Sequence, residues 1–183
     1  MILPIVLYGN PVLRKKGAKI SRATKEHEKF ITDLLETMRE SQGIGLAAQQ
    51  VGQAIQIAVV DVSTVEDRPS KMWIQQKEVD IKEHMPIILI NPQLTLTKTK
   101  ETDIEGCLSF PGIDAHISRS KRVHVKTLKL DGSTFEFEAA GLLGRAIQHE
   151  TDHLHGILFT DRMFPEEKKL LKEKIEAIRK TAS

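Results

Sequence analysis

Residues 149–153 read His-Glu-Thr-Asp-His, and this short stretch decides how the surrounding chain is interpreted. On an α-helix, side chains four residues apart share one face, so His149 and His153 can bind the same metal ion. Glu150 lies beside that face, where its carboxylate can exchange a proton with a water that a divalent ion has made more acidic. The chain has seven histidines, so two can also meet by chance on a surface helix. On this stretch alone, a hydrolytic metal site is a hypothesis.

The hydrophobic pattern predicts three helices, one of which carries this motif. Residues 140–155 have helical periodicity, and Gly156 is expected to end that helix. Residues 24–42 form an amphipathic pattern, with Gly43 as the expected stop. Residues 165–180 open with a proline and two glutamates and end with basic residues, which favours a third helix. The motif is therefore expected on the middle helix.

The rest of the chain carries mostly strand signals. Residues 55–62 and 86–91 are β-branched and apolar, which is typical of buried strands. The apolar opening, residues 1–9, is short and has no basic start, so it predicts a first strand rather than a signal peptide. Residues 63–85 are polar and are expected to form a surface excursion, partly ordered around Trp73. Further strand signals lie at residues 94–100, 104–108, 116–120, 122–130 and 134–138, with a hairpin turn at Asp131-Gly132.

Strands flanked by helices without regular alternation predict the α+β class. We expect mixed or antiparallel sheets packed around a central helix that carries the HExxH motif, plus a C-terminal helix. The 183 residues, 40% hydrophobic and 28% charged, suit one compact domain. A net charge of +2 gives no argument for specific nucleic-acid binding, and no apolar run is long enough to span a membrane. The single cysteine allows no intrachain disulfide, which favours a reducing, cytoplasmic location.

A hydrolytic metal site needs a third protein ligand and one open position. Downstream of the motif the only histidine is His155, which lies on a different face and is better explained as a cation near the helix C-terminus. The remaining candidate is Cys107, although a lone cysteine is often just a small buried apolar residue. We favour the ligand role, because the two histidines lack a third partner. The predicted set is one thiolate, two imidazoles and a water.

Three motifs of the chain resemble those of the peptide deformylase family. They are GIGLAAQQ at residues 43–50, EGCLS at residues 105–109 and QHETDH at residues 148–153, and their order and spacing match as well. The similarity extends from the N-terminus to about residue 164. It implies a catalytic domain over residues 1–164, with residues 165–183 as a C-terminal helical extension of the same domain.

The resemblance implies a metal-dependent hydrolase. Its reaction removes the formyl group from the N-terminal formyl-methionine of newly made peptides, giving formate and a free amine terminus. The implied roles are metal ligation by Cys107, His149 and His153, general acid–base catalysis by Glu150, and oxyanion stabilisation by the Gln50 amide and the Leu108 backbone N–H. Members of the family work best with ferrous iron, and zinc, nickel or cobalt can occupy the site. A thiolate and two imidazoles do not select iron by affinity, so the sequence leaves the metal open.

Helix geometry also predicts part of a substrate pocket. Leu142 and Ala146 precede His149 by seven and three residues, on the face that carries the ligand. They can line an apolar slot for an unbranched methionine side chain, although Leu142 fits a purely structural core position equally well. The slot is expected to be closed by Ile44 and by the backbone at Gly43 and Gly45.

Two further contacts are expected outside the pocket. Asp152 is predicted to pair with Arg119 and support the histidine ligands, with a surface ion pair as the alternative. Residues 165–183 hold six basic and four acidic side chains. This helix is compatible with ribosome docking, as in some relatives, but a solvated surface helix is the favoured interpretation.

Two other functions compete with deformylation. A zinc endopeptidase can use the same two-histidine helix, but it would lack its usual downstream ligand and leave Cys107 without a role. A non-catalytic metal-binding or ribosome-associated factor would have no need for Glu150 or Gln50, and purely structural metal sites are more often closed by four protein ligands.

Overall fold

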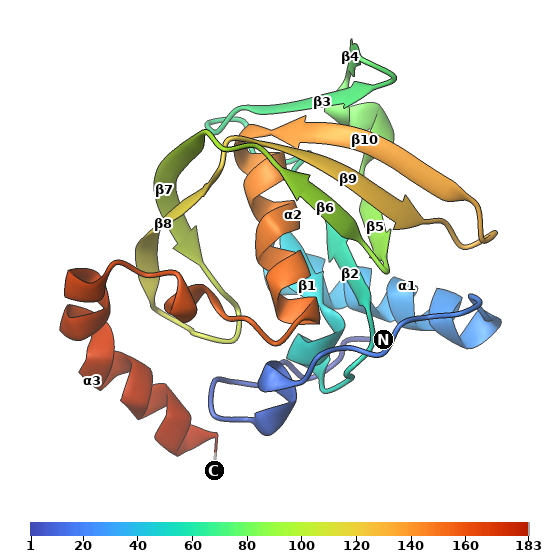
Figure 1. Ribbon diagram of the computed structural model, residues 1–183. Helices are drawn as coiled ribbons and strands as arrows, with labels where there is room; N and C mark the ends of the chain where they lie inside the picture. Colours follow the sequence, from blue (N-terminus) through green and yellow to red (C-terminus); the bar gives the residue numbers. More distant parts are fainter. Residues whose placement is uncertain (183) are drawn as a thin grey trace.

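The helix that carries the histidine motif, α2 (Gly141–Leu154), runs through the middle of the molecule (Figure 1). The computed structural model describes residues 1–182. Every residue of α2 from Leu142 to Leu154 is buried. A helix buried on all faces is typical of a protein core. The polar residues of the motif are therefore held by the protein interior rather than by solvent.

Three antiparallel sheets surround α2, as the α+β prediction requires. The first has the order β1-β2-β5, the second β4-β3-β10-β9-β6, and the third pairs β7 with β8. The strand bounds are β1 (Gly45–Ala47), β2 (Ile57–Val60), β3 (Ser70–Ile74), β4 (Lys77–Val79), β5 (Ile87–Ile90), β6 (Gln93–Leu96), β7 (Lys100–Gly106), β8 (Asp114–Ser120), β9 (Arg122–Leu128) and β10 (Thr134–Ala140).

Two more α-helices flank this arrangement. The first, α1 (Lys25–Glu40), packs on β1 and β2, and the last, α3 (Pro165–Thr181), lies at the C-terminal end. Short 3-10 turns complete the chain: η1 (Pro11–Arg14), η2 (Ala48–Val51), η3 (Ile81–His84) and η4 (Phe159–Asp161). Within residues 1–182, no helix combines the length and the apolar character needed to cross a membrane.

The hydrophobic core consists of three clusters. The largest lies between α2 and both the three-stranded and the five-stranded sheets, and it includes Leu142, Leu143, Ala146 and Ile147 of the helix. The second lies under α1, and the third is partly closed by α3 through Ile175. Because α2 enters the largest cluster with one face, its opposite face is free to carry polar groups.

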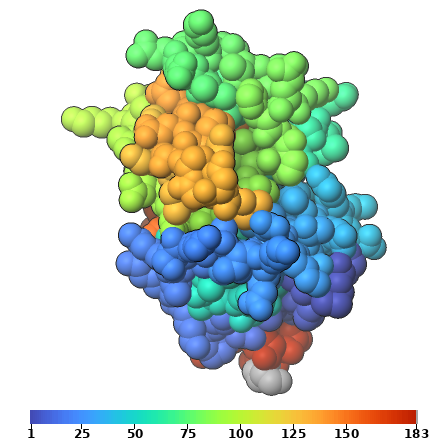
Figure 2. Space-filling model, turned by 90° about the vertical axis from the view of Figure 1, so that its right-hand side faces the viewer, coloured from blue at the N-terminus to red at the C-terminus, as the bar shows by residue number. Residues whose placement is uncertain are grey.

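The opening of the chain does not form the predicted strand. Residues 1–7 have no regular structure; in Figure 2 the darkest blue, which marks the start of the chain, lies at the lower right of the face, well below β10 (orange). Their backbone makes isolated bonds to two different segments: Val6 N–H to the Gln50 carbonyl at 2.8 Å and Tyr8 N–H to the Ser109 carbonyl at 2.9 Å. A strand needs a continuous ladder with one neighbour, and this segment has none.

Two other expectations need correction. The excursion over residues 63–85 is ordered: β3 and β4 form a hairpin that adds two strands to the five-stranded sheet, with Trp73 in β3. The helix predicted over residues 24–42 ends at Glu40, and the residue with left-handed backbone after it is Gln42 (φ 54°), not Gly43. Gly43 closes the turn by donating its N–H to the Met38 carbonyl at 2.9 Å.

Candidate active site

The structure brings the three predicted metal ligands together. Cys107 lies directly after β7, whereas His149 and His153 lie one turn apart on α2. The thiol sulfur and one ring nitrogen of each histidine lie within 4.8 Å of one another. Cys107 Sγ and His153 Nε2 are 3.4 Å apart. One sulfur and two nitrogens from three sides suit a divalent ion that keeps a position open for water or substrate.

The two histidines have different surroundings. Burial opposes a charge on His149, yet hydrogen bonds to Cys107 and Glu105 raise its pKa well above the usual value. Burial lowers the pKa of His153, with the positive field of His149 and Arg119 adding to the effect. A metal ion competes with a proton for these ring nitrogens, so binding of an ion would leave both rings neutral.

Glu105 holds His149 in place, a role that the sequence reasoning missed. Its Oε2 lies 2.9 Å from His149 Nδ1, which directs the other ring nitrogen toward the ligand cluster. Arg119 and Arg145 donate to the same carboxylate at 2.5–3.0 Å. Burial alone would raise the pKa of Glu105, but the bonds from His149 and Arg119 lower it far below its usual range. The signal was present, because Glu105 precedes Cys107 by two residues and alternate strand residues share a face.

The predicted pair between Asp152 and Arg119 is confirmed. Arg119 Nη1 donates to Asp152 Oδ2 at 2.8 Å, and both residues are buried. Among the described residues, the carboxylate of Asp152 forms no hydrogen bond to a histidine; its hydrogen-bonded connection to His149 runs through Arg119 and Glu105. The pair is therefore part of a buried charge network rather than a surface ion pair.

The Glu150 side chain lines the pocket, and one of its carboxylate oxygens lacks a hydrogen-bond partner among the described residues. The residue is 4% exposed, and its buried Oε2 has no hydrogen-bond partner among the described residues. Buried polar atoms are nearly always paired, so this oxygen is a point at which a water or substrate would be expected. Burial is the main reason that the pKa of Glu150 is raised to about 7. A carboxyl group with such a pKa can both accept and return a proton near neutral pH.

Gln50 is buried in η2 and its amide has a fixed orientation. Its Oε1 accepts the N–H of Ala47 at 2.9 Å, so the amide NH2 must point the other way. That NH2 group lies 3.5 Å from Cys107 Sγ and 3.4 Å from Ser109 Oγ. The side chain thus presents a donor to the ligand cluster, which is the direction that an oxyanion donor requires.

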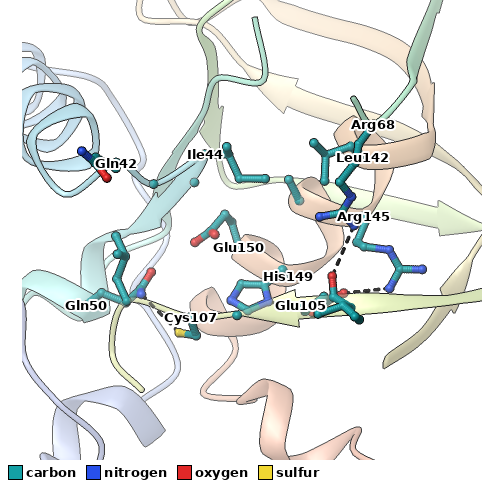
Figure 3. Close-up of a pocket in the computed structure, with 16 residues that line it drawn as sticks. Gln42, Ile44, Gln50, Arg68, Glu105, Cys107, Leu142, Arg145, His149 and Glu150 are labelled. Atoms are coloured by element: carbon teal, nitrogen blue, oxygen red, sulfur yellow. Dashed lines mark hydrogen bonds and ion pairs between the residues drawn. The ribbon is translucent and has the colours of Figure 1, made fainter. Parts of the chain in front are cut away.

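A cavity of about 210 Å³ lies over these groups. In Figure 3, Ile44 and Leu142 lie on one side of it and Cys107 and Gln50 on the other, with Glu150 between them. The predicted residues that line the cavity are Gly43, Ile44, Gly45, Gln50, Cys107, Leu108, Leu142, Ala146, His149 and Glu150. The remaining predicted residue, His153, lies deeper and is 1% exposed.

Leu142 has both of the roles considered for it. It lines the cavity and also belongs to the largest core cluster. Four further residues that line the same cavity were not predicted from the sequence: Gln42, Arg68, Ile104 and Arg145. Arg68 lies in the segment expected to be a surface excursion, and it donates to Asp103 Oδ2 at 2.6 Å and to the Ile104 carbonyl at 3.2 Å.

Comparison with known proteins identifies the family. A family model described as polypeptide deformylase matches residues 2–169. The chain belongs to this family. Deformylases remove the formyl group from the N-terminus of newly made peptides, so the chain is a hydrolase that acts on a formyl amide, and the family depends on a metal ion. The cluster of one cysteine and two histidines is a site that can hold such an ion.

Individual deformylases are similar over nearly the whole chain. The peptide deformylase of Methylacidiphilum infernorum is 51% identical over 180 residues, which cover 98% of this chain and 94% of that protein. The crystal structure of the deformylase from Thermotoga maritima has a TM-score of 0.77 at 36% identity and covers 90% of this chain and 99% of that one. A Plasmodium falciparum deformylase has a TM-score of 0.84 at 31% identity, with coverage of 97% and 96%. The α+β fold is therefore that of the deformylases.

Proposed function

We propose that this deformylase holds one divalent metal ion with Cys107, His149 and His153, and that the ion in the cell is Fe2+. The observation that supports the ligand set is the approach of the three ligand atoms to within 4.8 Å beside a cavity that also contains Glu150. When bound, such an ion supplies a Lewis acid that makes a water more acidic and polarises the formyl oxygen. The choice of iron rests on the family resemblance, and zinc, nickel or cobalt can take its place.

The pocket would bind the formylated methionine. Its unbranched side chain fits beside Leu142 and Ala146 of α2, with Ile44 on the other side. The backbone at Gly43 and Gly45 closes this slot without side chains that would fill it. Placing the methionine there would bring its formyl carbon next to Glu150 and the ligand cluster. Holding the reacting groups in this way lowers the barrier by converting the encounter into an intramolecular step.

The protein's own groups would then move the proton and stabilise charge. Glu150 accepts a proton from the attacking water and returns it to the departing amine, so that one water and one formamide give formate and a free amine. The Gln50 amide and the backbone N–H of Leu108 donate to the oxygen that becomes negative as the carbon turns tetrahedral. Gln50 is already oriented by Ala47, so this donation needs no rearrangement.

Metal content and formate release, measured together, distinguish a metal ligand from the acid–base residue. Protein purified without oxygen and loaded with iron is incubated with formyl-Met-Ala-Ser, and formate and new amine are measured. Cys107→Ala is expected to lose metal affinity. Glu150→Ala is expected to retain the metal and to lose about 10²- to 10⁴-fold in kcat, the usual contribution of a general acid–base. Full metal and activity in Cys107→Ala would remove the thiolate from the ligand set.

The same assay distinguishes the competing functions. Cleavage of internal peptide bonds without formate would identify an endopeptidase. Bound metal without any turnover would identify a non-catalytic binder. Metal analysis of protein kept from oxygen, purified from its native source, tests whether the resident ion is iron.

We further propose that the catalytic domain spans residues 1–164 and that residues 165–183 extend the same domain, in a cytoplasmic enzyme. The support is the packing of Ile175, with Leu171 and Ile178, into the third core cluster. Of the extension, Ser183 lies outside the described residues.

Ribosome docking through α3 is a separate hypothesis. It is tested by co-sedimentation of full-length and truncated protein with ribosomes, and equal binding of the two would remove it.

A further inference from the structure

A row of charged side chains connects the surface of the protein to the ligand cluster. Arg162, the residue directly after η4, donates from Nε to Asp152 Oδ2 at 2.6 Å and from Nη2 to Asp152 Oδ1 at 2.7 Å. Asp152 in turn accepts Arg119 Nη1 at 2.8 Å, and Arg119 uses its remaining nitrogens on Glu105. Glu105 contacts His149. The row is therefore Arg162, Asp152, Arg119, Glu105 and His149.

Exposure falls from Arg162 at the surface to the buried inner part of this row. The side chain of Arg162 is 42% exposed, that of Asp152 is 12%, and those of Arg119 and Glu105 are 3% and 5%. Arg162 lies apart from the cavity in which the reaction would take place. It lines a separate small hollow with Arg119 and Asp152. The hydrogen-bonded connection between Arg162 and the ligand cluster therefore runs through the row.

The geometry of each link restricts the next one. Arg162 binds both carboxylate oxygens of Asp152, and such a bidentate pair fixes the rotation of the carboxylate as well as its position. Oδ2 is thereby held toward Arg119, whose guanidinium divides its donors between Asp152 and Glu105. If Asp152 were free to rotate, Arg119 would lose one of its two anchors. Glu105 would keep its bond from Arg145, but the guanidinium of Arg119 would hold its carboxylate less firmly against His149.

We infer that Arg162 is a positioning residue for the metal site: by holding Asp152, it fixes through Arg119 the Glu105 carboxylate that orients His149. Arg162 also ties the segment after α2 back to the helix beside His153, because Asp152 is the residue before that histidine. The inference rests on the proposed ligand set. Its measurable consequence is metal affinity, which does not require substrate.

The chain offers a matched control for a merely structural effect. Arg14 makes a bidentate pair with Asp161, at 2.5 and 3.0 Å, and it attaches the same η4 segment to η1. Its side chain is 47% exposed, close to the value for Arg162. In the described part of the chain, the side chains of Arg14 and Asp161 form no hydrogen bond to a member of the row, so Arg14→Met removes a comparable ion pair without disturbing Asp152.

The experiment measures Co2+ affinity by chelator competition for the full-length protein and for Arg162→Met, Arg162→Lys, Arg14→Met and Glu105→Gln. Partners that orient a ligand typically contribute about 10- to 100-fold to metal affinity, which is the expectation for Glu105→Gln. Because Arg162 acts three links further out, we expect a loss of about 3- to 10-fold in Arg162→Met, below that range. Arg162→Lys is expected to recover part of it. Arg14→Met should leave the Co2+ affinity unchanged. It should lower the thermal midpoint by about as much as Arg162→Met does.

Two readouts make the result specific. The thiolate-to-cobalt absorption band reports the geometry of the site, and it should change in Arg162→Met and remain as in the parent protein in Arg14→Met. In an Asp152→Asn background, Arg162→Met should cause no further loss, since the two residues act along one row. Affinity within twofold of the parent in Arg162→Met, or an equal loss in Arg14→Met, would overturn the inference. If Cys107→Ala bound Co2+ as tightly as the parent, the proposed ligand set would fail instead.

Discussion

Gly45 lies directly against the carboxyl group of Glu150. A Cβ built on Gly45 would meet Cγ and Cδ of Glu150 at 2.8 Å and Oε1 more closely still. Real Cβ atoms essentially never show such distances, so the Glu150 side chain would have to move. Glu150 is buried at the wall of the cavity, so this movement would take the carboxyl group away from its position beside the ligand cluster. The absent side chain at residue 45 is thus a condition for the orientation of the proposed acid–base group.

Gly45→Ala is therefore expected to lower kcat while the metal content stays unchanged. A displacement of about 1 Å in a reacting group commonly costs about 100-fold in rate. The measurement combines formate release under saturating substrate with metal analysis of the same sample. A variant with full metal and unaltered kcat would show that Glu150 either tolerates the displacement or does not carry the proton.

For single residues, the sequence predicts which side chains bind the metal better than it predicts which side chains hold those ligands in place. Cys107, His149 and His153 could be selected because few residue types bind metals and their spacing in the motifs is restrictive. Glu105 and Arg145 could not be selected from the sequence as residues that hold the ligands in place. They are 40 residues apart in sequence, and an acidic or basic residue looks like a solvated one until the fold buries it.

At the scale of elements, the N-terminus of α2 is capped by a distant segment. Ala140 has no side chain that could accept a helix N–H. Instead, the N–H of Leu142 donates to the Pro69 carbonyl and that of Leu143 to Ser70 Oγ, both at 3.0 Å. Gly141 has a φ of +66°, and a Cβ there would collide with the Pro69 carbonyl. The segment expected to be a surface excursion thus fixes the start of the helix that carries both histidines.

Ser70→Ala should lower the free energy of unfolding by about 1 kcal/mol, the typical effect of losing a side-chain cap. The Leu143 N–H would be left without its acceptor, and it lies in a largely buried environment. Urea unfolding followed by circular dichroism gives the value. Ser21→Ala, at an exposed loop position, is the control and should change the stability by less than about 0.5 kcal/mol. Equal stability of the two variants would contradict capping by Ser70.

The helix α3 offers a comparison between two aliphatic residues. Ile175 is 7% exposed and belongs to the third core cluster, whereas Leu170 is 83% exposed. Ile175→Ala should destabilise the protein by about 2–4 kcal/mol, since it removes buried methyl groups and leaves a cavity. Leu170→Ala should have an effect within about 0.5 kcal/mol. Thermal unfolding of both variants measures the difference, and a small effect at Ile175 would mean that α3 docks loosely.

The sequence predicted helices more accurately than the edges of the sheets. The three helical patterns end within two residues of α1, α2 and α3, because a 3.6-residue period is local. The opening segment has the composition of a strand but lacks a partner along its length, and partners are decided by the whole fold. The β3–β4 hairpin was missed for the opposite reason. Its surroundings and β4 are polar, and β3 becomes a strand that buries Met72 only because it pairs with the edge of β10.

For the whole molecule, the proposed metal would connect two parts of the chain that pack into different hydrophobic clusters. Cys107 follows β7 of the two-stranded sheet, and His153 lies 46 residues later on α2, which packs between the other two sheets. Cys107 packs against the third hydrophobic cluster, whereas the apolar face of α2 belongs to the first. An ion bound by both sides would connect the two clusters directly, and the unfolded chain has no comparable site.

Removal of the metal should consequently destabilise the entire fold rather than the pocket alone. A ligand that binds only the folded state, at a free concentration about 1,000-fold above its Kd, adds about 4 kcal/mol to stability. For a chain of this length each kcal/mol corresponds to about 2–4 °C, so chelation should lower the thermal midpoint by about 8–16 °C. Calorimetry of the loaded and chelated protein measures the shift, and Cys107→Ala should show little response to chelator because it binds metal weakly from the start. A midpoint unchanged by verified loss of the ion would mean that the ligands are held in place by the protein alone, and that the ion contributes to the reaction without contributing to the fold.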